Sequence, residues 1–78
     1  MTQKEYKRCT GLMIDAISSA NRSKEAFNAS SNMNLSDVNR NVQELIGQNS
    51  LGYAEGISQV LVVLGFKHDR MEELQNLL

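Results

Sequence analysis

Apolar residues recur in the first third of the chain at the spacing of one helix face. They fall three or four positions apart, with charged residues mainly between them: Tyr6, Cys9, Met13, Ala16, Ile17, Ala20 and Phe27. Because an α-helix turns once every 3.6 residues, this spacing predicts a long helix over residues 3–27. Gly11 costs this helix about 1 kcal/mol against alanine, which favours a close helix contact there.

Small polar residues cluster over residues 28–34 and predict a connecting loop. Asn34 can cap the next helix, with Asp37 three positions on as in a capping box, and Ser36 is the rival cap.

Two apolar stripes run side by side from residue 35 to residue 64. The first is Val38, Val42, Leu45, Asn49, Gly52, Gly56, Val60 and Val63, and the second is Ile46, Tyr53, Ile57, Leu61 and Leu64. One helix over 35–64 would be about 45 Å long, whereas a compact globule of this size is about 30 Å across. We therefore expect a break or kink near residues 47–50, where Gly47 can end one helix and Asn49 or Ser50 can start another. A continuous rod is the alternative.

Gly65 follows the last periodic residue and is expected to end the second helix, with Phe66 folding back onto its last turn. Asp69 and Glu72 have the spacing of a further capping box. Residues 70–77 then predict a short helix. The fold expected is all-α, a hairpin of two long helices plus a short C-terminal helix, forming a single domain over residues 1–78.

Five consecutive apolar residues, 60–64, cover every side of a helix. A helix that is apolar all round is buried all round, so we expect a second chain to cover this turn in a helical-bundle oligomer. A compact monomer, in which the 70–77 helix covers it, is the alternative. Gly52 and Gly56 lie one turn apart and predict a close helix crossing, although a ligand cleft or a flexible joint would also use them. The expected interface residues are Gly52, Gly56, Val60, Val63 and Leu64.

Composition narrows the class of protein. The chain has 78 residues, 41% of them hydrophobic, no proline and a formal charge of −1. This charge gives no general field for nucleic acid or anionic lipid. The N-terminal residues are polar, and the longest apolar run is too short for a membrane span. We expect a cytoplasmic protein without a membrane partner.

Catalytic residue types are scarce. Cys9 and His68 are the only cysteine and histidine, and no spacing links them. Cys9 lies on an apolar stripe and is expected to fill the core, and His68 is expected to be a solvated loop residue. The glycines form no phosphate-binding loop. We expect no enzyme, no metal and no cofactor.

A helix-turn-helix with Gly47 in its turn is disfavoured by charge. No Lys or Arg occurs between Asn41 and Phe66, where the recognition helix would lie. Affinity for DNA depends largely on neutralising phosphates, so nucleic acid is an unlikely partner.

Cations gather instead in the first half of the chain. An aromatic ring beside cations can stack a base and hold a phosphate, which makes a candidate site for a nucleotide-like anion from Tyr6, Lys7, Arg8, Arg22 and Lys24. Tyr6 and Arg22 would lie about 24 Å apart on one helix, so this site would need two copies of the chain. An exposed helix face of mixed charge is the alternative interpretation.

The function expected first is a non-enzymatic binding protein, a small oligomeric helical module that docks on another protein and adapts or inhibits it. The alternative is an oligomer that sequesters a nucleotide-like anion, and a DNA-binding regulator ranks third. The chain resembles, in general character, the small accessory proteins of bacteria and their phages, and no motif carries that resemblance.

Overall fold

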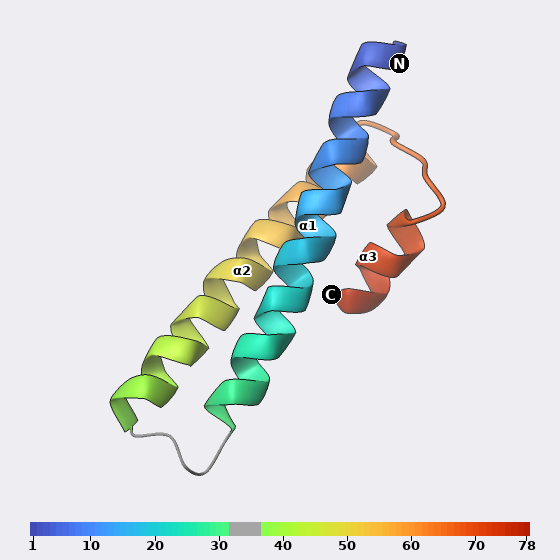
Figure 1. The fold of residues 1–78 in the computed structure, drawn as a ribbon. Coiled ribbons are helices and arrows are strands. Elements are labelled where there is room, and N and C mark those ends of the chain that lie inside the picture. The colour runs from blue at the N-terminus through green and yellow to red at the C-terminus, as the bar shows by residue number, and fades with distance from the viewer. Residues whose placement is uncertain (32–36) are drawn as a thin grey trace.

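Three helices make up the computed structural model of the protein over the residues that it describes, 1–31 and 37–78. Helix α1 covers Gln3–Ser30, α2 covers Asp37–Val63 and α3 covers Met71–Leu77. α1 and α2 form an antiparallel hairpin, and α3 folds back along α1 (Figure 1). The expected all-helical hairpin with a short third helix is confirmed, whereas its assembly into an oligomer stays a prediction.

Side chains cap both ends of α1. At its start, the Glu5 N–H donates to Thr2 Oγ1 at 3.1 Å. At its end, the hydroxyls of Ser30 and Ser31 donate to the Phe27 carbonyl at 2.8 and 3.0 Å. The helix therefore runs three residues beyond the expected end at residue 27, into the predicted loop. The expected caps Asn34 and Ser36 lie outside the described residues.

Helix α2 is continuous, so the expected break near residues 47–50 is wrong. Its 27 residues span about 40 Å, and the molecule is correspondingly long, 49 × 17 × 16 Å. Gly47 is buried inside the helix, where a Cβ would lie 3.0 Å from the Phe27 ring. The glycine admits this ring rather than ending a helix. It also provides no turn for a helix-turn-helix.

The hydrophobic core lies where all three helices meet. Its largest fully buried side chains are Met13 of α1, Leu61 of α2 and Leu74 of α3. The other buried members are Cys9, Ala16, Ile17, Ala20, Ala54, Phe66 and Met71. Towards the end of α1 the buried residues are Ser23, Ala26 and Ser30, which are small enough to let α1 and α2 approach closely.

Gly65 ends α2 as expected. Its φ is +73°, its N–H donates to the Val62 carbonyl, and the Phe66 N–H donates to the Leu61 carbonyl. This is the Schellman arrangement, and it returns the Phe66 ring to the core. The capping box expected at Asp69 is wrong, because the residue preceding α3 is Arg70 and no side chain caps that helix.

Candidate functional site

The surface of α2 that faces away from α1 is the first candidate site. Buried α2 positions include Gly47, Ala54, Ser58 and Leu61. The first apolar stripe is displaced from them by two residues, which is about 200° around a helix with 3.6 residues per turn. We call this stripe the outer face; it consists of Val38, Val42, Leu45, Asn49, Gly52, Gly56, Val60 and Val63.

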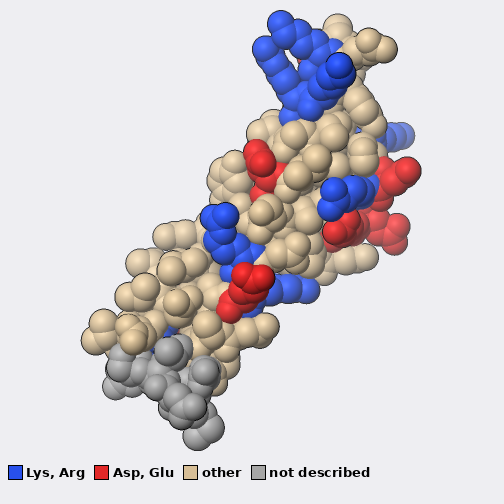
Figure 2. All heavy atoms as spheres, viewed as in Figure 1, with Lys and Arg blue, Asp and Glu red and all other residues tan. Residues whose placement is uncertain are grey.

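The outer face is exposed along its whole length and carries no charge. Its side chains reach 71% exposure at Val38, 58% at Leu45 and 85% at Val63. Figure 2 shows charged side chains along α1 and α3, whereas the α2 surface at the lower left is mostly uncharged. An apolar, uncharged face of this length is typical of a helix that contacts a partner.

Gly52 and Gly56 leave two open positions in the middle of the outer face. A Cβ at either glycine would have no neighbour within 4 Å. No close crossing within the chain therefore occurs there, and a crossing with another molecule stays a prediction. Gly11 has equally open surroundings, so the close contact expected at that residue is wrong.

The apolar turn at residues 60–64 is largely exposed. Leu61 alone is buried, while Val60, Val62 and Leu64 are 52%, 56% and 56% exposed. α3 packs against α1 instead of covering this turn. The cover by the 70–77 helix, which the monomeric alternative expected, is therefore wrong, and the oligomeric state stays a prediction.

The five residues expected to bind an anion do not come together within one chain. Tyr6 and Lys7 line one hollow near the N-terminus, and Arg8 lines another with Cys9 and Leu64. Arg22 lines a third, between α1 and α2. Lys24 lines none of these three hollows.

The hollow that contains Arg22 is a polar groove of about 420 Å³, open to solvent. α1 contributes Asp15, Ser18, Ser19 and Arg22, and α2 contributes Asn49, Ser50 and Tyr53. The aromatic ring that shares a hollow with Arg22 is thus Tyr53, which is 51% exposed. Periodicity assigns Tyr53 to an apolar stripe, and only the position of α1 beside α2 puts it in a groove with Arg22.

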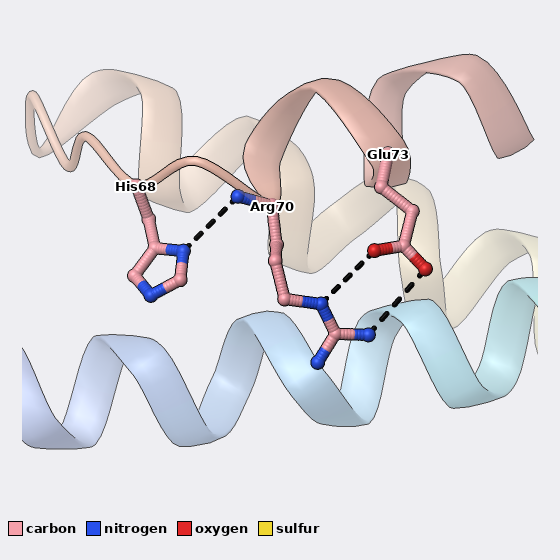
Figure 3. Close-up of polar contacts among 3 residues, drawn as sticks. All are labelled: His68, Arg70 and Glu73. Atoms are coloured by element: carbon pink, nitrogen blue, oxygen red, sulfur yellow. Dashed lines mark hydrogen bonds and ion pairs between the residues drawn. The ribbon is translucent and has the colours of Figure 1, made fainter.

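His68 is more than a solvated loop residue, because it organises the link between α2 and α3. Its ring centroid lies 6.0 Å from that of Phe66 and 6.3 Å from that of Tyr6. Its Nδ1 accepts a hydrogen bond of 3.1 Å from the Arg70 N–H (Figure 3). The imidazole thereby satisfies the amide of the residue that precedes α3.

One ion pair lies on α3. Arg70 Nε is 2.9 Å from Glu73 Oε2, and both side chains are about half exposed (Figure 3). The hydrogen bond from Arg70, with a smaller contribution from its charge, lowers the pKa of the Glu73 carboxyl. The same contact raises the pKa of the guanidinium. The surface position makes this pair a minor contributor to stability.

In the part of the chain that the structure describes, few side chains of the types used in catalysis lie together. Cys9 is buried in the core, as expected. Residues 1–31 and 37–78 contain no group of three or more His, Cys, Asp or Glu side chains that could hold a metal ion. Within the same residues, no helix has the length and hydropathy of a membrane span.

Comparison with known proteins adds no relative, because no protein-family model, curated protein or solved structure matches the chain.

Proposed function

We propose that this protein is a non-enzymatic binding module that works as a homo-oligomer and contacts its second copy through the outer face of α2. The observation that supports the proposal is the exposed, uncharged outer face, from Val38 at 71% to Val63 at 85% exposure. The assembled module would then present its remaining surface to another protein, which it adapts or inhibits.

The pattern of side-chain sizes favours an antiparallel arrangement of the two α2 helices. When Leu45 lies opposite Gly56 of the second copy, Asn49 lies opposite its Gly52, and Val38 lies opposite its Val63. Each large residue near the centre then meets an open position, since neither glycine has a neighbour within 4 Å. Large residues that insert between small ones are the basis of close helix packing.

Asn49 has a definite role in this arrangement. A single polar residue on an apolar helix face lowers stability but can specify register. Opposite Gly52 its amide has room to reach backbone groups or water, whereas a slipped register would bury it against a large apolar side chain without a partner. Asn49 is the polar residue of the outer face, and it lies beside the two glycines.

The experiment measures molecular mass by analytical ultracentrifugation from about 1 to 200 μM, concentrations at which a micromolar dimer would form. The variant Leu45→Glu places a charge on the outer face, and Gln48→Glu places the same charge on an exposed α2 position outside it. We expect a dimer or larger assembly for the wild type and Gln48→Glu, and a helical monomer for Leu45→Glu. Because Leu45 is 58% exposed, this substitution should leave the fold of the single chain intact.

Cysteine pairs test the register in a Cys9→Ser background. The antiparallel arrangement predicts that Leu45→Cys and Gly56→Cys chains, mixed and oxidised, form the mixed disulfide. Disulfides between two Leu45→Cys chains would indicate a parallel arrangement instead. A wild-type monomer at every concentration would overturn the proposal as a whole.

A further inference from the structure

We propose that the polar groove between α1 and α2 binds a mononucleotide, whose phosphate pairs with Arg22 and whose base stacks on Tyr53. This inference goes beyond self-association and does not depend on it, because one chain supplies every residue of the groove. The groove has a volume of about 420 Å³ and is open to solvent, so a bound nucleotide would stay partly exposed.

The groove has a positively charged residue, Arg22, at one end and a negatively charged residue, Asp15, at the other. Arg22 and Asp15 lie seven residues apart on α1, which is about 10 Å along the helix axis. The structure shows no ion pair or hydrogen bond between either of them and another described residue. Both groups therefore stay available for a ligand that is anionic at one end and carries hydrogen-bond donors at the other.

Arg22 suits the anionic end. Its planar guanidinium can form two parallel hydrogen bonds with a phosphate, which a lysine cannot do. The hydroxyls of Ser18 and Ser50 line the same groove and can donate to further phosphate oxygens.

Tyr53 and Asp15 suit the nucleoside. The half-exposed Tyr53 ring offers a face on which a base can stack, an interaction that tolerates any base. The Asp15 carboxylate can accept hydrogen bonds from ribose hydroxyls or from an exocyclic amino group. Inorganic phosphate would use the Arg22 end alone, and a nucleoside would use the Tyr53 and Asp15 end alone.

Isothermal titration calorimetry of the full chain at low salt, with AMP and GMP as probes, tests the site. We expect one mononucleotide per chain. Adenosine and inorganic phosphate should each bind at least about tenfold more weakly, a difference of about 1.4 kcal/mol, because each uses only one end of the groove. A six-nucleotide single strand of DNA forms a further arm. If it binds and the mononucleotides do not, the groove takes nucleic acid and the proposal fails.

Each key residue has a matched control. Arg22→Gln should raise the Kd for AMP at least about tenfold, whereas Lys4→Gln, an exposed cation of α1 outside the groove, should leave it within about twofold. Tyr53→Leu should weaken AMP and adenosine but not phosphate, whereas Tyr53→Phe, which keeps the aromatic ring, should weaken none of them. Equal losses in a variant and its control, or no heat with AMP or GMP at about 1 mM, would overturn the assignment.

Discussion

Gly47 and Gly11 are helical glycines with opposite surroundings. A Cβ at Gly47 would lie 3.0 Å from the Phe27 ring, whereas a Cβ at Gly11 would meet nothing within 4 Å. Both positions gain helix propensity from alanine, but at Gly47 the added methyl group must displace a half-buried ring.

Gly11→Ala should therefore raise the free energy of unfolding by about 0.5–1 kcal/mol. The free energy of unfolding of Gly47→Ala should be lower than that of Gly11→Ala by about 1–3 kcal/mol, the usual cost of an overpacked contact. Urea denaturation followed by circular dichroism measures both values. Equal gains in the two variants would show that the Phe27 ring yields freely and that Gly47 is not needed for helix packing.

The residue that ends α2 is under a different constraint. Gly65 has a φ of +73°, a conformation in which a side chain approaches the following carbonyl. Gly65→Ala should cost about 1–2 kcal/mol of stability, although a Cβ there would meet no neighbour within 4 Å. Gly65→Asn should cost less, because asparagine tolerates this conformation better. Chemical denaturation measures the free energy of unfolding of both variants. A lower value for Gly65→Asn than for Gly65→Ala would contradict the explanation from backbone conformation.

At the level of elements, periodicity predicted the helices and their order but not which face of α2 meets α1. The buried positions of α2 include Gly47, Ala54 and Ser58, and α1 meets α2 with residues such as Ser23 and Ala26. Small and hydroxyl side chains give a weak hydropathy signal, so this interface is hardly visible in the sequence. The strongly apolar stripe that is visible turned out to be the exposed one.

The same reason limited prediction of the candidate site. The sequence points to Arg22 because cations gather in the first half of the chain, whereas it groups Tyr53 and Asn49 with apolar stripes of their helix. Only the lateral placement of α1 against α2 puts these three residues in one groove.

The ion pair between Arg70 and Glu73 predicts a dependence of stability on pH. Hydrogen bonding to Arg70 lowers the pKa of the Glu73 carboxyl in the folded protein. A carboxyl with a lowered folded pKa stabilises the fold above its unfolded pKa, and that contribution is lost as the pH falls through the folded pKa. Glu73→Gln should therefore slightly lower the Tm at pH 7, and its difference from the wild type should shrink at pH 3.

Glu72→Gln is the control for this pair, because the neighbouring carboxylate forms no ion pair with another described residue. Thermal melts of both variants and the wild type at the two pH values make the comparison. A deficit of Glu73→Gln that persists at pH 3 would show that the side chain acts through packing rather than through its charge.

At the scale of the whole molecule, the core is small and a long apolar face is left exposed. The core occupies the end of the hairpin where α3 packs, and the molecule extends 49 Å, so much of α2 contacts a single neighbouring helix. Small chains often compensate for limited burial by assembling. In the proposed dimer, the outer face would supply between two copies the apolar burial that one chain of this length cannot supply internally.

Gly56→Ala separates the stability of the chain from that of its assembly. Within one chain the added methyl group meets nothing, so helix propensity should stabilise the monomer by up to about 1 kcal/mol. Against Leu45 of a second copy the same methyl should cost about 1–3 kcal/mol. Because association raises the Tm with concentration, the Tm of Gly56→Ala should exceed that of the wild type in dilute solution and fall below it when concentrated. Calorimetric melts over a hundredfold concentration range measure the crossing. A variant that is more stable at every concentration would show that the outer face meets no second copy.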